Sequence, residues 1–272
     1  MRASDRLQRD TIADFEAQWW AYRDSDGYFG SPEIFADMLG PLMRPDEVKG
    51  RRVLEIGSGA GRIVNILLGL GAAHVIAVEP SSSIEVLAEN LREHLDRITL
   101  LRLPGDRVPP TADIDLVFSI GVLHHIPDPA PAVKAAFEAL RPGGRIAIWL
   151  YGREGNAAYL AFALPLRMLT RRLPHRVLAA LVRLIDLPLV AYIGLCRVLP
   201  LPLAGYMREV MARLDPPKRR LTIYDQLNPA YAKYYMRSEA LDLLAGAGFQ
   251  DIGIHHRHGY SWSLVGTRPV AA

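Results

Sequence analysis

A glycine-rich segment in the first half of the chain has the residue types and spacing of a ligand-binding turn. It runs from Val53 to Gly61 with the sequence Val-Leu-Glu-Ile-Gly-Ser-Gly-Ala-Gly. The apolar residues before the glycines fit a buried strand, and the residues after Gly61 fit a helix. Glycine adopts positive φ without strain and lets a ligand lie against the backbone. The segment therefore predicts a ligand site at the end of a strand.

The charge of this turn distinguishes between the ligands that such turns bind. Nicotinamide and flavin enzymes use the spacing G-x-G-x-x-G. Here the spacing is G-x-G-x-G, and Arg62 stands where the last glycine of the dinucleotide pattern would be. Glu55 at the mouth of the turn would repel a pyrophosphate and attract a ligand that carries an ammonium and a sulfonium. We therefore expect a cationic ligand and keep an NAD-dependent oxidoreductase as the alternative enzyme.

Polar side chains that could hold the rest of this ligand follow the next predicted strands. Glu79 ends the strand that comes about twenty residues after the turn, where a carboxylate can accept both hydroxyls of a ribose. Asp106 follows a third strand and could accept a hydrogen bond from an adenine amino group. Ligands of open α/β sheets bind outside the carboxyl ends of the strands, so these groups converge on one crevice. A solvated acid at a strand end remains the alternative for each carboxylate taken alone.

Strands and helices alternate between Arg51 and Tyr151, and this alternation would position the crevice. Strands are predicted at Arg52–Ile56, His74–Val78, Ile98–Leu101, Ile114–Ser119 and Arg145–Tyr151, and helices at Gly61–Leu70, Ser83–Arg92 and Ala130–Leu140. This order implies right-handed crossovers and a parallel sheet. Near the C-terminal end, a helix at Ser238–Ala247 precedes strands at Phe249–Arg257 and Tyr260–Thr267. These two strands are joined too tightly for a crossover helix, so they should pair antiparallel.

The stretch from Val53 to Tyr151 resembles the class I S-adenosylmethionine-dependent methyltransferases, with a domain similar to methyltransferase type 11. The motifs that carry the resemblance are Leu54–Gly61, Val78–Pro80, Gly105–Asp106, Asp115–Ser119, Leu123–Asp128 and Leu140–Gly144. It implies an α/β fold with a Rossmann-like, doubly wound, seven-stranded sheet whose last strand is antiparallel. It also implies S-adenosyl-L-methionine as the cofactor, with S-adenosyl-L-homocysteine as its product.

The resemblance further implies the roles of individual residues. It places Glu55 and the glycines near the methionine part of the cofactor, Glu79 on the ribose and Asp106 near the adenine. The cofactor-binding residues predicted in this way are Glu55, Gly57, Ser58, Gly59, Gly61, Glu79, Pro80, Asp106, Ser119 and Gly121.

Methyl transfer to a hydroxyl or an amine needs an aligned acceptor and a group that removes its proton, and it needs no metal. His124 and His125 follow the fourth strand, and either could be a general base near neutral pH, or else a structural residue on the cofactor side. Tyr231 and Tyr235 could line an acceptor pocket, or pack a loop against the sheet. We take these four as the candidate catalytic residues and predict no metal site.

The amino-acid composition indicates the cellular compartment and the binding partners of the protein. The single cysteine, Cys196, excludes a disulfide framework and a cysteine-based metal cluster. The first residues carry no apolar signal segment, so we expect a cytoplasmic protein. The net charge of +3 is small, and no base-flipping motif follows the fourth strand. The expected partner is therefore a small-molecule acceptor with no nucleic acid, and the expected state is a monomer or a homodimer.

The chain divides into four predicted segments. Residues 1–50 form an N-terminal helical lid, 51–156 the cofactor-binding core, 157–222 a helical cap insert, and 223–272 the completion of the core. The insert is rich in Leu, Ala and Arg, and its prolines predict several short helices that they break. Its longest uncharged apolar run, Leu187–Cys196, is far short of the roughly twenty residues that a membrane span needs. The insert fits a cap over an acceptor pocket, which we favour, a dimer interface, or a membrane-surface contact.

The sequence thus predicts an enzyme of the methyltransferase class in a bacterial-type small-molecule pathway. It would transfer a methyl group from S-adenosylmethionine to an O or N atom of a small apolar or aromatic acceptor. Two alternatives remain open. One is a lipid- or quinone-directed methyltransferase at the membrane surface, and the other is a cofactor-binding module without turnover.

Overall fold

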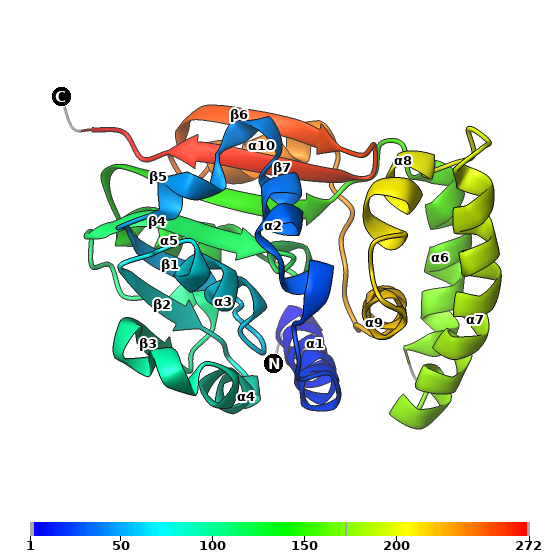
Figure 1. Ribbon diagram of the computed structural model, residues 1–272. Coiled ribbons are helices and arrows are strands. Elements are labelled where there is room, and N and C mark those ends of the chain that lie inside the picture. The colour runs from blue at the N-terminus through cyan, green and yellow to red at the C-terminus, as the bar shows by residue number, and fades with distance from the viewer. Residues whose placement is uncertain (1–2, 172, 271–272) are drawn as a thin grey trace.

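A seven-stranded sheet forms the centre of the molecule (Figure 1). The computed structural model describes residues 3–171 and 173–270. The sheet has the order β3-β2-β1-β4-β5-β7-β6. Its strands are β1 (Arg52–Ile56), β2 (His74–Val78), β3 (Ile98–Leu101), β4 (Ile114–Ile120), β5 (Leu140–Tyr151), β6 (Gln250–Arg257) and β7 (Ser261–Thr267). β1 to β5 pair in parallel, and β7 runs antiparallel to both β5 and β6. The predicted fold class, including the antiparallel last strand, is confirmed.

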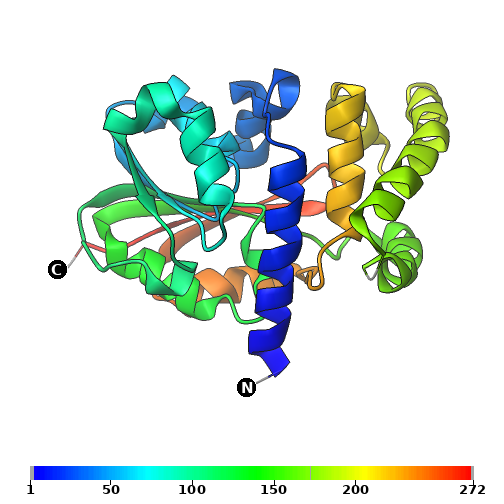
Figure 2. The ribbon, with the colours of Figure 1, turned by 90° about the horizontal axis from the view of Figure 1, so that it is seen from below.

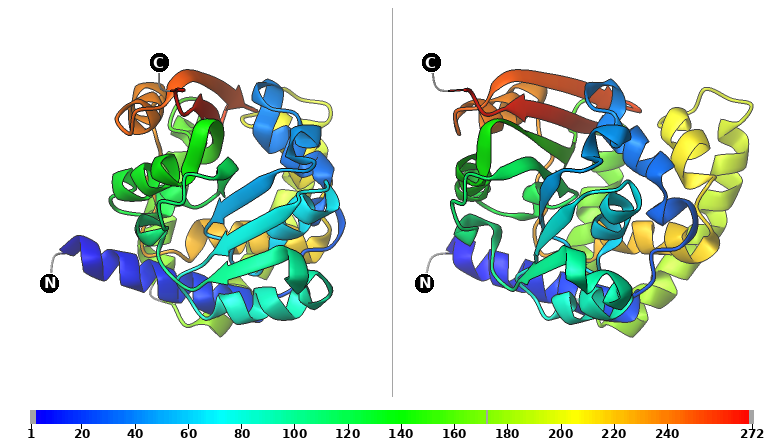
Figure 3. Two further views of the ribbon diagram at one scale, coloured as in Figure 1. Left: turned by 90° about the vertical axis from the view of Figure 1, so that its left-hand side faces the viewer. Right: turned by 60° about the vertical axis from the view of Figure 1, so that its left-hand side comes forward.

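Helices cover both faces of the sheet, as the views of Figure 3 show. One face carries α2 (Pro32–Leu39), α3 (Arg62–Gly69) and α4 (Ser83–Asn90), and the other carries α5 (Ala130–Ala139) and α10 (Arg237–Ala245). The central parallel strands are apolar nearly throughout because both faces are buried. On the first face, Phe35 of α2 meets Phe118 of β4 with ring centroids 5.3 Å apart.

Short helices make several of the turns at the ends of these elements. They are η1 (Gly27–Gly30), η2 (Gly40–Leu42), η3 (Pro45–Val48), η4 (Arg92–Arg97), η5 (Gly105–Arg107) and η6 (Leu123–His125). Of these, η5 and η6 follow β3 and β4 at the carboxyl edge of the sheet, where the parallel strands end. The crevice predicted from the sequence lies at this edge.

The N-terminal helix α1 (Ala3–Ala21) lies across this edge, between α4 and α9 (Pro216–Leu227) (Figure 2). It is tied on both sides. Ser82, just before α4, donates its hydroxyl to Glu16 at 2.7 Å. Asn228, just after α9, donates to the carbonyl of Asp14 at 3.0 Å. The helix therefore links the core to the segment that follows the insert.

The insert forms the outer layer on the far side of α9 (Figure 1). It contains α6 (Ala157–Thr170), α7 (His175–Cys196), α8 (Ala204–Tyr206) and the π-helical turn η7 (Met207–Met211). The prediction that prolines break its helices is wrong at two positions, because Pro165 lies inside α6 and Pro188 inside α7. A proline inside a helix costs about 3 kcal/mol. Each of these helices buries apolar side chains on one side, and that packing offsets the cost.

Candidate active site

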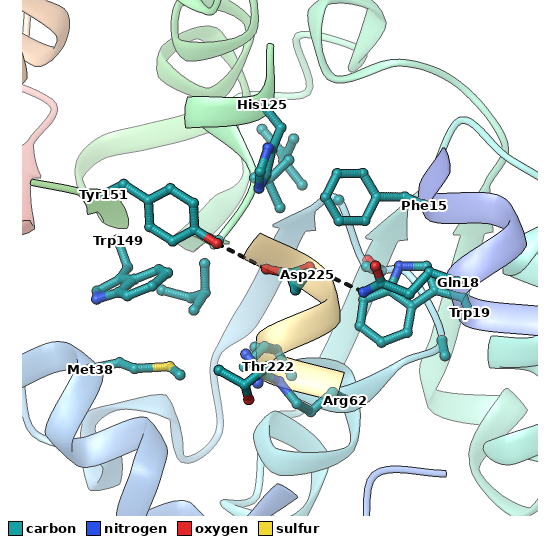
Figure 4. A pocket seen from close by; sticks show the side chains of 18 of the residues that line it. Phe15, Gln18, Trp19, Met38, Arg62, His125, Trp149, Tyr151, Thr222 and Asp225 are labelled. Atoms are coloured by element: carbon teal, nitrogen blue, oxygen red, sulfur yellow. Dashed lines mark hydrogen bonds between the residues drawn. The ribbon is translucent and has the colours of Figure 1, made fainter. Parts of the chain in front are cut away.

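A cavity of about 230 Å³ opens at the carboxyl edge of the sheet, between the glycine-rich loop, α1 and α9 (Figure 4). Its walls come from segments that are far apart in the sequence. α1 provides Phe15, Gln18 and Trp19, and α9 provides Thr222, Asp225 and Gln226. The strands and their loops provide the opposite wall. The cavity is therefore closed on one side by elements that the βαβ pattern does not contain.

The glycine-rich loop needs glycine for both its backbone angles and its close contacts. Gly57, Gly59 and Gly61 have φ values of +82°, +51° and +93°. A Cβ on Gly57 would lie 2.4 Å from the side chain of Val122, and one on Gly59 would lie 2.8 Å from Nε1 of Trp19. The loop is thus packed between the turn after β4 and the lid helix α1. Among the predicted loop residues, Gly57 and Ser58 line the cavity, while Gly59 and Gly61 support it from behind.

Glu55 is a buried carboxyl group facing this cavity. Its side chain is 2% exposed, and Oε2 has no hydrogen-bond partner in the part of the chain that the structure describes. Burial raises the pKa of Glu55 to about 8, against the opposing effects of Ser58 and Arg62. An unpaired buried oxygen costs free energy, so this atom fits a ligand that donates to it.

Arg62, the first residue of α3, places a cation in the same cavity. Its guanidinium lies 4.3 Å from the ring centroid of Phe29. Burial lowers its pKa to about 10, and Glu55 opposes the shift, so the side chain is charged at neutral pH. The sequence marked Arg62 only as the residue that breaks the dinucleotide pattern. A cation and a carboxyl group therefore face one end of the cavity together.

Glu79 lies at the end of β2 and organises its own loop. Its Oε2 accepts from the backbone N–H of Gly59 at 2.9 Å, and its Oε1 accepts from the hydroxyl of Ser81 at 2.6 Å. Glu79 and Pro80 both line the cavity. This arrangement holds the glycine-rich loop against the end of β2.

The other predicted cofactor residues lie at different depths. Gly121 lines the cavity. Ser119 is fully buried and donates to the carbonyl of Ile56 at 3.3 Å. Asp106 is exposed, although its neighbours Pro104 and Gly105 line the cavity. The structure therefore brings the backbone beside Asp106 to the cavity rather than its carboxylate.

The two adjacent histidines of η6 have different surroundings. His125 lines the cavity, and its Nδ1 lies 2.9 Å from the carbonyl oxygen of Tyr231. A carbonyl oxygen only accepts, so Nδ1 carries the proton and Nε2 keeps its lone pair. Burial lowers the pKa of His125 to about 4, which keeps the ring neutral at pH 7. His124 is fully buried behind it and stacks on Tyr151 with ring centroids 3.8 Å apart.

The two candidate tyrosines lie outside the cavity wall. Tyr231 contributes its carbonyl to His125. Tyr235 is 3% exposed, and its backbone N–H donates to the carbonyl of Tyr151 at 2.8 Å. Their contacts therefore fix the backbone around His125 and Tyr151.

Asp225 of α9 is the residue at this site that the sequence argument missed. Its Oδ2 accepts from the phenol of Tyr151 at 2.9 Å and its Oδ1 from Nε2 of Gln18 at 3.1 Å, as Figure 4 shows. Gln226 donates to the Tyr151 oxygen at 2.6 Å. Burial, with Asp225 beside it, raises the pKa of Tyr151 well above its usual value, so the phenol stays protonated. The one sequence signal is that Asp225 is the only acidic residue in α9.

The core of the chain is similar to a known protein family and to curated sequences. Residues 54–148 match the model of a methyltransferase domain. A tRNA U34 carboxymethyltransferase from Chromohalobacter salexigens is 34% identical over 125 residues, which are 44% of this chain and 37% of that protein. The protein of the same name from Hahella chejuensis is 35% identical over 113 residues, 40% of this chain and 34% of that one. The match thus spans little more than a third of these relatives.

Solved structures share the fold over nearly the whole chain. The 1,6-didemethyltoxoflavin-N1-methyltransferase of Burkholderia thailandensis, solved with S-adenosylhomocysteine, gives a TM-score of 0.53 at 16% identity, covering 99% of this chain and 92% of that one. A possible histamine N-methyltransferase from Thermotoga maritima gives 0.50 at 15% identity, covering 96% and 97%. The predicted resemblance, and the cofactor that it implies, are confirmed.

The prediction that excluded nucleic acid as a partner is wrong. The curated relatives are named for a tRNA acceptor, and this contradicts the exclusion. The exclusion rested on a net charge averaged over the chain and on one missing motif. Neither quantity tests whether a single group of a larger molecule can enter a pocket.

Proposed function

Since residues 54–148 form a methyltransferase domain of the class I S-adenosylmethionine-dependent enzymes, we propose that the protein transfers a methyl group to an oxygen or nitrogen of an acceptor with a small apolar or aromatic reacting part. One observation carries the proposal. A single cavity holds the glycine-rich loop on one wall and both His125 and Asp225 on the others. When bound, S-adenosylmethionine supplies a methyl group on a positively charged sulfur.

The residues at the β1 end of the cavity fit the amino-acid part of the donor. The unpaired Oε2 of Glu55 suits an ammonium group, and the guanidinium of Arg62 suits a carboxylate. Gly57 and Ser58 leave room for the donor against the backbone. The carboxylate of Asp225 across the cavity adds negative potential, which favours a cationic donor.

His125 is the general base in this proposal. Its ring is neutral at pH 7, its tautomer is fixed by Tyr231, and its Nε2 keeps a lone pair to take the acceptor's proton. His124 has no such access, because it is buried behind His125 and against Tyr151. We therefore propose that His124, Tyr231 and Tyr235 are positioning residues, which hold His125 and Tyr151 in place.

Asp225 orients the acceptor and connects it to the lid. Gln18 and Tyr151 hold its two oxygens in place. A hydroxyl or amine that enters the cavity can donate to the remaining lone pairs of this carboxylate. Because Gln18 belongs to α1, the position of the lid helix also sets the position of the Asp225 carboxylate that orients the acceptor. We accordingly keep residues 1–50 as a lid and 157–222 as a cap, with α9 joining the cap to the cavity.

A comparison of histidine variants tests this function. Formation of S-adenosylhomocysteine is followed with a panel of phenols, aromatic amines and heterocycles, and the most active acceptor is kept. His125→Ala should lower kcat by about 10²- to 10⁴-fold, the usual contribution of a general base, without changing donor affinity. The exposed His94 provides the matched control, His94→Ala, which should be indistinguishable from the parent. An unchanged kcat in His125→Ala would show that His125 is not the general base.

A second candidate function is the transfer of a carboxymethyl group to a tRNA, from a sulfonium donor that carries a carboxymethyl group in place of the methyl group; the names of the curated relatives favour it. The same cavity would then take one nucleoside of the tRNA. Unmodified tRNA and the small acceptors are each assayed with S-adenosylmethionine and, separately, with the carboxymethyl sulfonium donor, and the mass of the product tells a methyl from a carboxymethyl group. We place either reaction in the cytoplasm, in keeping with a single buried cysteine that forms no disulfide.

A further inference from the structure

The exposed apolar side chains of this protein are gathered on one part of its surface. Of the sixteen large apolar side chains that are exposed in the described part of the chain, twelve lie between Phe162 and Leu199, on α6, α7 and the turns beside them. Six of them are at least 65% exposed: Phe162, Met168, Leu169, Leu184, Leu187 and Val198. We call these six side chains the apolar face.

The apolar face points away from the rest of the molecule. α6 and α7 form the outermost layer of the ribbon and both pack on α9 (Figure 1). Leu178 and Val182 of α7 are buried on the inner side, while Leu184 and Leu187 are exposed. Exposed apolar side chains that are scattered singly are normal on a soluble protein, whereas a concentration of them on one part of the surface fits an interaction site.

α7 has the composition of a membrane helix but is held along the surface of the protein. By length and hydropathy it could cross a bilayer, and only 22% of its most apolar window is buried. Its inner side, however, carries Asp186, which is 3% exposed and paired with Arg219 and Arg220 of α9. Pulling α7 out to span a membrane would leave these charges unpaired. The outer side of α7 is therefore exposed, while its inner side stays packed on α9.

The exposed charges on the segment that carries the apolar face have one sign. Between Ala157 and Leu203 the only acidic residue is Asp186, which is buried. The exposed charged side chains that the structure describes there are Arg171, Arg176, Arg183 and Arg197. Arg176 and Arg183 are seven residues apart, so they lie on one flank of α7, beside the exposed leucines.

We propose that the apolar face docks on an anionic lipid bilayer. Its side chains enter the boundary between headgroups and acyl chains, and the flanking arginines meet lipid phosphates. A second copy of the chain fits less well, because a two-fold contact through this face brings arginines together. An RNA would use the arginines but leave the apolar face in water. The proposal concerns how the protein is located and does not depend on which acceptor is methylated.

Sedimentation with vesicles tests the docking. The full chain is mixed with phosphatidylcholine vesicles that contain, or lack, an equal amount of phosphatidylglycerol. We expect binding to the anionic vesicles that weakens as salt is raised, and much weaker binding to the neutral ones. Binding that is absent from both kinds of vesicle, or equal on both and insensitive to salt, would overturn the proposal.

Matched variants separate this face from general surface properties. Leu184→Ser and Leu187→Ser should each lower vesicle affinity by roughly tenfold, and Arg176→Glu and Arg183→Glu by roughly fivefold or more. Val270→Ser, at a side chain that is 72% exposed, and Arg92→Glu are the controls and should bind as the parent does. All six substitutions are at exposed positions, and thermal unfolding checks that the fold is retained.

A second copy of the chain or an RNA on the apolar face would give results that differ from those of a bilayer. If the parent forms a stable dimer that Leu184→Ser dissociates, with vesicle binding unchanged, the face is a protein interface and the proposal fails. It fails equally if vesicles do not bind but RNA does, with a loss in the arginine variants alone. Loss of vesicle binding in the face variants alone supports it.

Discussion

The two halves of the cavity are built in different ways. The half that we propose for the donor, called the donor half, consists of the loop after β1 and the end of β2, and Glu55, Gly59 and Glu79 lie within one short stretch of chain. The half that we propose for the acceptor, called the acceptor half, consists of separate segments. Asp225 meets Gln18, which is 207 residues away, and Tyr151, which is 74 residues away. Local sequence therefore specifies the first half, whereas only the packing of the lid and the cap specifies the second.

Because the two halves are built from different segments, a substitution should be able to impair one half without impairing the other. A change in the glycine-rich loop should remove donor binding, and a change in Asp225 should leave donor binding intact and slow the reaction. The lid helix is the exception, because Trp19 lies against the donor loop while Gln18 holds Asp225.

Gly59→Val should have the largest effect. Gly59 has φ of +51°, which costs a β-branched residue about 3 kcal/mol, and its new Cβ would lie 2.8 Å from Trp19. We expect affinity for S-adenosylhomocysteine, measured by calorimetry, to fall by roughly 150-fold or more, as about 3 kcal/mol implies. Gly69→Ala is the control, since that glycine ends α3 with nothing near its Cβ position. Undiminished affinity in Gly59→Val would mean that the donor binds elsewhere.

The strands and turns that form the proposed donor half could be predicted from the sequence because their signals are local. β1, β2 and β3 have the predicted bounds, since each is a short apolar run that a turn ends. Glu55 is identifiable as the one acid near the end of the first run, and Glu79 as the acid directly after the second. β5 begins at Leu140 rather than at Arg145, because the chain pairs Leu140 with Ile114 across a register shift that periodicity does not reveal.

The acceptor half could not be predicted in the same way. Asp225 follows Ile223 and Tyr224 in a helix whose pattern is ordinary, and its importance arises only when α9 packs against α1 and β5. The distinction between His124 and His125 is also tertiary. Adjacent in sequence, they differ because the Tyr231 carbonyl fixes one ring at the cavity and Tyr151 covers the other.

Asp225→Asn should affect the acceptor half alone. The substitution keeps the shape of the side chain but removes its negative charge, and it replaces one of the two oxygens that accept from Gln18 and Tyr151 with an NH₂ donor. We expect kcat/KM for the acceptor to fall roughly 30-fold, the equivalent of about 2 kcal/mol for hydrogen bonds to a charged group. Asp242→Asn, at an exposed acid on α10, is the matched control and should leave both constants unchanged. If Asp225→Asn weakens donor binding as much as it slows turnover, the two halves are not separable.

The smallest effect, measured over a single pH unit, is the pH dependence of donor binding. In the free protein, burial raises the pKa of Glu55 to about 8, so between pH 5 and 7 the carboxyl is protonated. An ammonium group prefers the carboxylate, so binding releases a proton and donor affinity rises with pH, by up to about tenfold per pH unit. The sign for folding is opposite. The folded state holds the proton more tightly than the unfolded chain, so stability without donor falls as pH rises from about 4.5 towards 8.

Glu55→Gln should remove the pH dependence of donor affinity and the part of the stability trend above about pH 6, because an amide does not titrate. The pKa of His125 is about 4, so that ring does not titrate between pH 5 and 7. Asp14 does, because burial raises its pKa to about 6, and it lies on the lid helix. Asp14→Asn is therefore the necessary control. If the slope is lost in Asp14→Asn and kept in Glu55→Gln, the pH dependence belongs to the lid, and Glu55 does not hold the ammonium. If the pH dependence of donor affinity is lost only in Glu55→Gln, the unpaired carboxyl oxygen of Glu55 binds the ammonium group of the donor. Donor binding then depends on residues of the donor half alone.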